Sequence, residues 1–253
     1  MRLLVGLLLF VSCWAHAGPS VLVYSNDNYV VSENVTEIRP LASITKLMTA
    51  MVVLDTGQDL NSKVQLINKW TTILPKKSYS KKDLLVATLV RSDNSAAESL
   101  AHSYPGGRDA FMRAMNNKAK ELQMSNTSFL DPTGLSVFNV STALDIQKML
   151  IAAQQYDLIK TISTMKEAQI ANEDRKKIKQ IVFPNTNRTA LTNFSNITVT
   201  KTGLTSAAGW CVGLVVEERG QNYYIVILGS QSKQNRLDKI KELMYNHVIK
   251  TSF

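Results

Sequence analysis

Strand-like segments stand at both ends of the chain, and helix-like segments occupy its middle. Residues 21–24 and 29–31 are short β-rich runs, and the Asn-Asp-Asn run at 26–28 favours a tight turn between them. Near the other end, three more β-rich runs are separated by glycine-containing turns and predict an antiparallel meander; they cover residues 197–202, 210–217 and 223–228. We therefore expect an α+β fold in which the two ends share one antiparallel sheet of five strands, flanked by helices, with a mostly helical lobe beside it.

The middle of the chain shows the apolar spacing of several helices. The predicted helices cover residues 43–54, 82–90, 95–102, 108–123 and 142–153, with Ser141 as the expected cap of the last. A final amphipathic helix is predicted over residues 235–248. We expect it to pack against the sheet, with a peripheral membrane contact as the alternative.

The N-terminus has the pattern of a secretory signal. Met1-Arg2 is followed by an apolar run over residues 3–11 and by Ala15-His16-Ala17, a small-x-small cleavage site. We expect cleavage after Ala17, export to the periplasm, and a single catalytic domain over residues 18–253. Cys13 offers the alternative of a lipid anchor.

Composition narrows the chemistry. The chain has two cysteines and three histidines, and the signal would remove Cys13 and His16. Cys211 is left alone in an apolar run, so we expect a core residue, no internal disulfide, no metal site and no cofactor. The formal charge of +9 falls by one unit with Arg2 and suits an anionic surface. The lysines stand in scattered pairs without interleaved aromatic residues, and export argues against nucleic acid, so we expect no nucleic-acid partner.

Ser43-Ile-Thr-Lys46 is a Ser-x-x-Lys motif on a predicted helix. The i, i+3 spacing puts hydroxyl and amine on one helix face, within reach of each other. A serine hydroxyl needs a base to accept its proton, and a lysine can be that base if burial or a neighbouring cation lowers its pKa. An ordinary helix start explains the motif equally well when it is taken alone.

Two further motifs follow in the chain. Ser92-Asp93-Asn94 interrupts two helices; Ser92 could relay a proton to a leaving group, and Asn94 could bond a peptide or hold Lys46. Lys201-Thr-Gly203 closes a predicted strand. Lys201 and Thr202 could bind a substrate carboxylate, and Gly203 would let another chain approach the strand edge.

The three motifs, in this order on helix, loop and strand, are those of serine β-lactamases and penicillin-binding proteins. The surrounding residues resemble low-molecular-mass penicillin-binding proteins of the D-alanyl-D-alanine carboxypeptidase/endopeptidase family. The resemblance covers about residues 20 to 230, and its further segments are Pro40 to Met48, Tyr104-Pro-Gly-Gly107, Asp131-Pro-Thr-Gly-Leu-Ser136, Asn139-Val-Ser-Thr142, Asn185-Thr-Asn-Arg188 and Lys201 to Gly209.

The resemblance implies a role for each motif residue. Ser43 would attack a D-alanyl peptide bond and form an acyl-enzyme, with Lys46 accepting its proton. Ser92, backed by Lys201, would protonate the leaving amine, and Asn94 would contact the substrate backbone. Lys201, Thr202 and Gly203 would line the carboxylate end, and the backbone N–H groups of Ser43 and Leu204 would form the oxyanion hole. The partners implied are peptidoglycan peptides and, as covalent inhibitors, β-lactams.

Four functions remain to be compared. The residues after Lys201 suffice for the sheet and one helix, which favours a DD-endopeptidase over a carboxypeptidase with an added domain. Asp93 also fits class A β-lactamases, but the Glu and Asn that those enzymes use for deacylation are missing between Asn94 and Lys201, where Asp131-Pro-Thr-Gly134 stands instead. A non-catalytic cell-wall binder would have no reason to keep Ser43, Lys46, Ser92 and Lys201 together.

Overall fold

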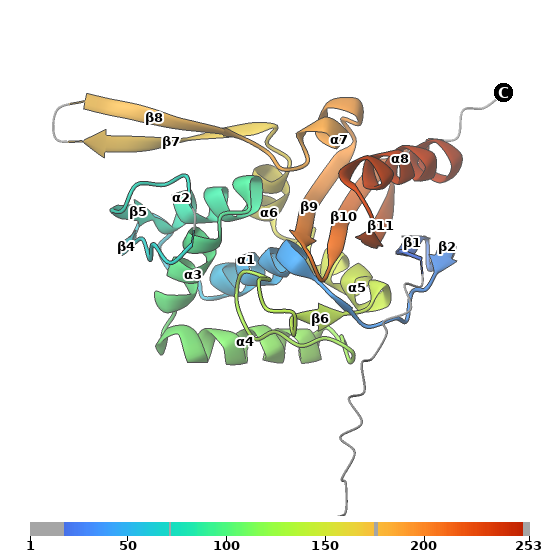
Figure 1. Cartoon of the computed structure of the whole chain (residues 1–253), viewed down its shortest axis with the longest axis horizontal. Coiled ribbons are helices and arrows are strands. Elements are labelled where there is room, and N and C mark those ends of the chain that lie inside the picture. The colour runs from blue at the N-terminus through green and yellow to red at the C-terminus, as the bar shows by residue number, and fades with distance from the viewer. Residues whose placement is uncertain (1–17, 71, 175–176, 250–253) are drawn as a thin grey trace, which may run out of the picture.

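The two ends of the chain meet in one five-stranded antiparallel sheet (Figure 1). A computed structural model describes residues 18–70, 72–174 and 177–249, with only the backbone at 172–174 and 177–179. The strand order is β2-β1-β11-β10-β9. The strands are β1 (Ser20–Ser25), β2 (Asn28–Glu33), β9 (Ile197–Thr205), β10 (Gly209–Glu218) and β11 (Gln221–Ser230). This confirms the predicted α+β architecture. The predicted signal, residues 1–17, lies outside the described residues.

The first hairpin follows from its turn residues. Asn26 and Asp27 both have positive φ angles, 49° and 58°, which a tight two-residue hairpin turn requires and which asparagine and aspartate tolerate. Hence β1 and β2 pair directly, with Val21 opposite Glu33.

The predicted helices are present, with corrections at their ends, and the sequence analysis missed two short ones, α6 and α7. They are η1 (Ala42–Ile44), α1 (Thr45–Asp55), α2 (Lys81–Val86), η2 (Ala87–Arg91), α3 (Asn94–His102), α4 (Gly107–Glu121), α5 (Ala143–Ala153), α6 (Asp157–Ser163), α7 (Arg188–Asn193), α8 (Lys233–Leu243) and η3 (Met244–Val248). The predicted helix 82–90 is α-helical only to Val86 and continues as the π-helical turn η2. Thr142, rather than Ser141, caps α5, because its side chain accepts the N–H of Asp145.

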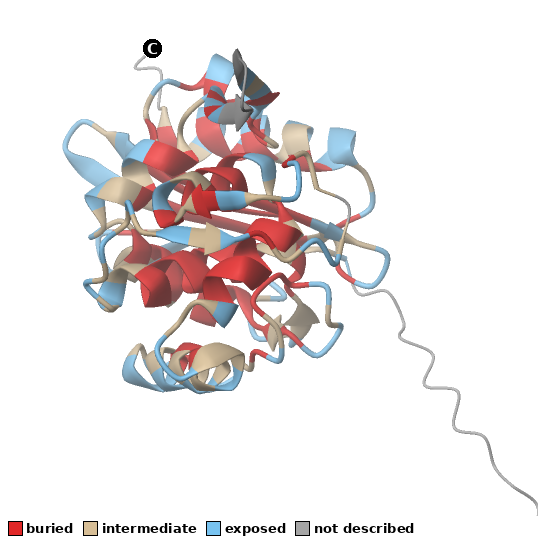
Figure 2. Ribbon diagram, turned by 90° about the vertical axis from the view of Figure 1, so that its left-hand side faces the viewer, coloured by how far each residue is buried: buried red, intermediate tan, exposed pale blue. Residues whose placement is uncertain are grey.

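The sheet is buried on both faces (Figure 2). Side chains alternate along β1, so Leu22 packs into the core beneath the helical lobe, while Val21 and Val23 pack into the core beneath α8. Ile240 and Leu243 of α8 belong to that second core. This is the packing predicted for the final helix. No helix in the described part of the chain is long and apolar enough to cross a membrane.

A long hairpin, β7 (Glu167–Asp174) with β8 (Lys177–Pro184), extends from the body of the molecule (Figure 1). The sequence pattern did not predict it, because its alternation is broken by charged residues. Ala168, Ile170 and Phe183 anchor its base in the core. Two small ladders add β3 (Arg39–Pro40) to β6 (Val140–Ser141) and β4 (Lys63–Gln65) to β5 (Ser78–Ser80).

Cys211 is a free cysteine with no exposed surface. Burial raises the pKa of its thiol to about 11, which keeps it protonated and unreactive at neutral pH.

Candidate active site

Ser43 lies in the short turn η1 that leads into α1. The preceding residue, Ala42, has a φ of +47°, a left-handed conformation that residues with a side chain rarely adopt. Such backbone strain persists only where the surrounding structure holds it in place. Here the turn is held from two sides, by the loop at Gly134 and by strand β9 at Gly203.

The two glycines explain how closely these segments approach Ser43. Gly134 has a φ of +84°, and a Cβ built on it would lie 1.8 Å from the carbonyl oxygen of Ala42. A Cβ on Gly203 would lie 2.9 Å from the Leu41 oxygen and 3.0 Å from the Ser43 nitrogen. The sequence led us to expect that Gly203 makes room for an incoming substrate chain. The structure gives another reason, since the missing side chain makes room for the Ser43 turn itself.

Lys46 lies one turn further along and is fully buried. Its Nζ is 2.9 Å from Ser43 Oγ, 2.6 Å from Asn94 Oδ1 and 2.6 Å from the carbonyl oxygen of Thr133. Burial lowers the pKa of Lys46 to about 7, although the charges of Asp131 and Asp93 act to raise it. A lysine with this pKa is substantially neutral at neutral pH, which is what a general base beside a hydroxyl requires.

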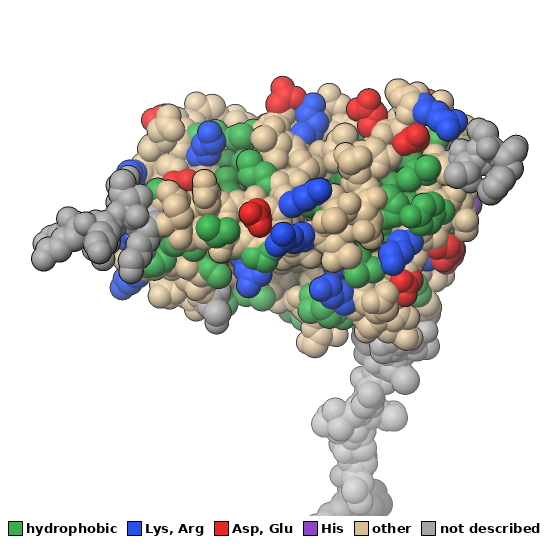
Figure 3. Space-filling model, turned by 90° about the horizontal axis from the view of Figure 1, so that it is seen from above, with side chains coloured by type: hydrophobic (Ala, Val, Ile, Leu, Met, Phe, Trp, Pro, Cys, Tyr) green, Lys and Arg blue, Asp and Glu red, His purple; other side chains and the backbone are tan. Residues whose placement is uncertain are grey.

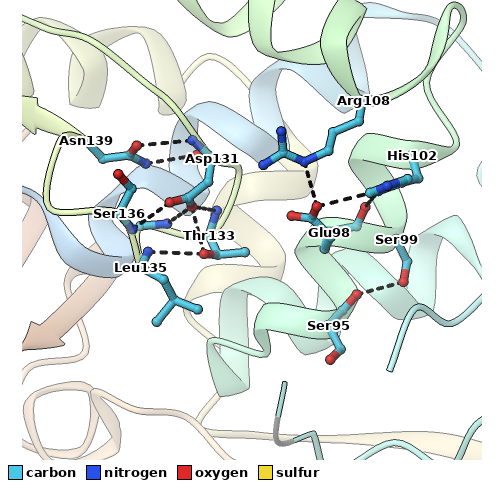
Figure 4. A network of polar contacts seen from close by, with 11 residues as sticks. Ser95, Glu98, Ser99, His102, Arg108, Asp131, Thr133, Leu135, Ser136 and Asn139 are labelled. Atoms are coloured by element: carbon cyan, nitrogen blue, oxygen red, sulfur yellow. Dashed lines mark hydrogen bonds and ion pairs between the residues drawn. The ribbon is translucent and has the colours of Figure 1, made fainter. Parts of the chain in front are cut away.

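The carbonyl that accepts Lys46 Nζ belongs to the loop over residues 131–139. Figure 4 shows the polar contacts within this loop. The Asp131 carboxylate accepts the N–H groups of Thr133, Gly134 and Ser136 and the hydroxyl of Thr133. Burial acts to raise the pKa of Asp131, but these hydrogen bonds outweigh it and lower the pKa. The buried Asn139 amide completes the loop by accepting the N–H groups of Leu130 and Asp131. Asp131 and Asn139 thus act on Lys46 through the backbone, a role that the resemblance did not assign.

Ser92 and Lys201 form a second pair, which joins the end of η2 to strand β9. Ser92 follows η2 in a left-handed conformation with a φ of +65°. Its Oγ accepts a hydrogen bond from Lys201 Nζ at 2.9 Å, and the same Nζ donates to the carbonyl oxygen of Thr202, also at 2.9 Å. The three motifs are therefore brought together at one place, with each serine bonded to one buried lysine.

No carboxylate of the described residues pairs with Lys201. Burial, Lys46 and Arg236 all act to lower its pKa well below 10.5. The sequence led us to expect a fixed positive charge. In the structure the charge is unfavourable until an anion binds beside it, so a substrate carboxylate would both pair with Lys201 and favour its protonated form.

The other motif residues, which lie next to these two serine–lysine pairs, make contacts within the protein. Asp93 caps α3 by accepting the N–H of Ala96, and its other oxygen accepts the hydroxyl of Thr72 and the N–H of Ile73. The Thr202 hydroxyl donates to Thr186 Oγ1 at 2.7 Å. Leu204 lies on β9, which is an edge strand of the sheet, and its side chain is 49% exposed. Both backbone groups expected to bind an oxyanion therefore belong to the contact between η1 and β9.

Glu98 is a buried carboxylate that the sequence motifs did not reveal. It stands one helical turn after Asn94, and its Oε1 lies 2.6 Å from Arg108 Nε and 3.6 Å from His102 Nδ1 (Figure 4). Its Oε2 has no hydrogen-bond partner among the described residues. The Arg108 contact joins α3 to the start of α4 and so supports the helix that presents Asn94.

The arrangement can perform serine-based acyl transfer. Lys46 can accept the proton of Ser43, and Ser92 can pass a proton onward while bonded to Lys201. Within the described residues, no group of three His, Cys, Asp or Glu side chains is placed to hold a metal ion.

Comparison with known proteins gives one consistent result. A family model described as D-alanyl-D-alanine carboxypeptidase, peptidase family S11, matches residues 14–232. The chain is 45% identical over 207 residues to the D-alanyl-D-alanine endopeptidase of Escherichia coli K12 and 40% identical over 205 residues to that of Pseudomonas aeruginosa PAO1. Each match covers 78% of this chain but 66% of the relative, just under two thirds of its length.

Solved structures agree with the fold. Penicillin-binding protein D2 from Listeria monocytogenes, solved with cefotaxime bound, superposes with a TM-score of 0.79 at 27% identity. The superposition covers 89% of this chain and 94% of the Listeria protein.

Proposed function

The chain belongs to the D-alanyl-D-alanine carboxypeptidase family of serine peptidases, S11, and from that premise we propose that it hydrolyses D-alanyl peptide bonds in peptidoglycan through an acyl-enzyme on Ser43. The observation that carries the proposal is the contact between Ser43 Oγ and the buried Lys46 Nζ at 2.9 Å, with the pKa of Lys46 near 7. The two relatives are named endopeptidases, which supports cleavage of cross-links.

The mechanism follows from the two serine–lysine pairs. Neutral Lys46 takes the proton of Ser43 as its oxygen attacks the carbonyl carbon of the D-alanyl bond. The N–H groups of Ser43 and Leu204 stabilise the oxyanion, worth about 3–4 kcal/mol for each donor in comparable sites. The proton taken up by Lys46 is passed through Ser92 to the leaving amine while Lys201 and Thr202 hold a carboxylate of the leaving group, and Asn94 contacts the substrate backbone. Lys46, neutral again, accepts a proton from the water that attacks the acyl-enzyme and returns it to Ser43 Oγ, which regenerates the serine.

β-Lactams should acylate the same serine, and the resulting acyl-enzyme should hydrolyse slowly. The two carboxylates nearest to Lys46 are both engaged: Asp93 in the cap of α3, Asp131 in the loop turn. Neither offers a free oxygen to activate water against an acylated Ser43, as a class A β-lactamase requires. Rapid steady-state nitrocefin turnover would contradict this assignment.

The acyl-enzyme proposal is tested with Ser43→Ala. The control is Ser125→Ala, which changes an exposed serine outside the three motifs. We expect Ser43→Ala to lose covalent labelling by fluorescent penicillin and cleavage of cross-linked muropeptide dimers, and the control to keep both. Unchanged labelling of Ser43→Ala would refute the mechanism.

The reaction products distinguish an endopeptidase from a carboxypeptidase. Purified dimers and pentapeptide monomers are digested separately, and the released fragments are identified by mass spectrometry. We expect dimers to be split. If only terminal D-alanine is released and dimers survive, the protein is a carboxypeptidase.

We further propose that the protein acts in the periplasm as a single catalytic domain over residues 18–253, after cleavage at Ala17. The signal-like pattern of residues 1–17 supports this. Intact-mass measurement of protein expressed with its N-terminus tests it, and a mass that retains residues 1–17 or carries a lipid on Cys13 would contradict it.

A further inference from the structure

A segment outside the three motifs lies beside the Ser92–Lys201 pair. Thr186 donates its N–H to the Val90 carbonyl at 3.0 Å and accepts the Thr202 hydroxyl. The segment around Thr186 therefore forms a bridge between η2, which precedes Ser92, and β9, which carries Lys201. A leaving group protonated by Ser92 would pass this bridge as it extends out of the site.

Three cationic residues lie next to the bridge along the backbone. Arg91 immediately precedes Ser92, and backbone hydrogen bonds to Asn185 bring Lys166 (2.9 Å) and Arg188 (3.1 Å) to the same place. All three side chains are exposed. Figure 3 views the molecule from above Figure 1 and shows several Lys and Arg side chains close together near the middle of that face, with an acidic side chain beside them.

Among the described residues, these cations have few anionic partners. Arg188 lies 3.6 Å from Glu167, with both side chains 57% exposed. Across the ranges that the structure describes, neither Arg91 nor Lys166 makes an ion pair. Exposed pairs such as Arg188–Glu167 are weak, so this pair does not cancel the positive charge of the three residues. We call Arg91, Lys166 and Arg188 together the rim.

The chemistry of the leaving group decides what the rim can do. In a carboxypeptidase reaction the leaving group is one amino acid, whose single carboxylate is taken by Lys201 and Thr202. In cross-link cleavage the leaving amine belongs to a second peptide, which carries further carboxylates beyond that position. A cation placed outside the Ser92–Lys201 pair can therefore act only on the second kind of substrate.

We propose that Arg91, supported by Lys166 and Arg188, binds a second carboxylate of the leaving peptide and so selects cross-linked substrates over terminal D-alanine. The inference rests on the proposed DD-peptidase function. Arg91 carries most of the effect because it is adjacent to Ser92 and because its planar guanidinium can bind a carboxylate through two hydrogen bonds.

The test uses Arg91→Ala, Arg91→Lys and the matched control Arg113→Ala, an exposed arginine of α4 for which no ion pair is seen in the described structure. Three rates are measured for each: kcat/KM for a cross-linked muropeptide dimer, kcat/KM for D-alanine release from a pentapeptide, and acylation by benzylpenicillin. We expect Arg91→Ala to lower the first by about fivefold to tenfold and to leave the other two within twofold. Arg91→Lys should recover part of the loss, and Arg113→Ala should change none.

Salt provides a readout that a structural role would not move. Raising NaCl screens an exposed charge contact. It should therefore reduce dimer cleavage by the wild type more than by Arg91→Ala.

Two results overturn the inference. If Arg91→Ala lowers all three rates together, Arg91 only positions Ser92. If it behaves like Arg113→Ala on the dimer, the rim does not select substrate. Wild-type protein that cleaves neither peptide would refute the proposed function itself, and the first measurement separates that failure from the other two.

Discussion

The site has a helical wall, with Ser43 and Lys46 on η1 and α1, and a strand wall, with Lys201 on β9. Each wall buries one lysine that bonds one serine, yet the two lysines have different surroundings. On the helical wall, Lys46 has three oxygen partners and lies within the field of two aspartates. On the strand wall, Lys201 has one hydroxyl and the carbonyl of its own neighbour, and the charges that act on it are those of Lys46 and Arg236.

This difference separates a base from a binding group. The helical wall supplies enough acceptors and negative charge to keep a buried amine near pKa 7, where it can take up and release a proton. In the part of the chain that the structure describes, the strand wall supplies no carboxylate to Lys201, so the charge of this lysine is paired only when the substrate brings one. The same residue type therefore serves two purposes, and the neighbouring residues decide which.

The largest effect should come from removing the lysines one at a time. Lys46→Met should lower the rate of acylation by a β-lactam by about 10³- to 10⁴-fold, because the proton acceptor is lost. Lys201→Met should lower it by only about 10²-fold, since the nucleophile keeps its base. Stopped-flow acylation with each variant's melting temperature as the folding control measures both. Equal losses would mean that the walls are not divided in this way.

The close contacts of Gly134 and Gly203 with the Ser43 turn should differ in their effect on stability. Gly134→Ala combines a positive φ with a collision against Ala42, so we expect the free energy of unfolding to fall by about 3 kcal/mol or more. Gly57→Ala is the matched control: its φ is also positive, at +62°, but nothing lies within 4 Å, and about 1 kcal/mol is expected.

Gly203→Ala should cost about 1 kcal/mol of stability, because its contacts are less severe. Its acylation rate should nevertheless fall about tenfold, since β9 moves away from the Ser43 nitrogen. Urea denaturation and acylation kinetics measure the three variants, and a Gly134→Ala protein as stable as Gly57→Ala would contradict the packing described here.

The smallest effect concerns pH. Acylation should rise with pH through about 7, because Lys46 is a base only when neutral. Asp131→Asn removes a charge that raises the pKa of Lys46, so the midpoint should move to lower pH by about one unit, at a reduced maximal rate. Asp157→Asn, which alters an exposed aspartate paired with Lys160, should leave the midpoint unchanged. A midpoint that moves upward in Asp131→Asn would show that the aspartate acts only through loop geometry.

The same pKa affects stability. The unfolded state, with an ordinary lysine pKa of 10.5, binds more protons than the native state between pH 7 and 10.5. The contribution of Lys46 to the free energy of unfolding therefore increases as pH rises through this window.

Local patterns predicted what depends on nearby residues. The i, i+3 spacing of Ser43 and Lys46 became a contact of 2.9 Å, and the alternation along the terminal strands became the sheet. The third partner of Lys46 could not be predicted in this way. It is a backbone carbonyl of Thr133, 87 residues away, and its position depends on the Asp131 carboxylate.

Other features depend on shape that a residue pattern does not encode. Gly203 is required by the turn beneath it rather than by substrate, and only the packing of β9 on Ser43 reveals this. The change of helix type at Ala87 and the β7–β8 hairpin were missed for the same reason. Apolar spacing reports which face is buried, but it does not report a π-helical turn or a hairpin anchored only at its base.

The position of β1 has a consequence for how the molecule is made. β1 lies between β2 and β11, with Ser20 opposite Leu228. A strand near the start of the chain therefore completes its pairing only when a strand near the end is present. The β1–β2 hairpin therefore has one long edge unpaired until β11 is available, and the sheet closes only after nearly the whole chain has emerged. The contacts that complete the fold are thus among the most distant in the chain, which favours slow folding and a long-lived open state before the sheet closes.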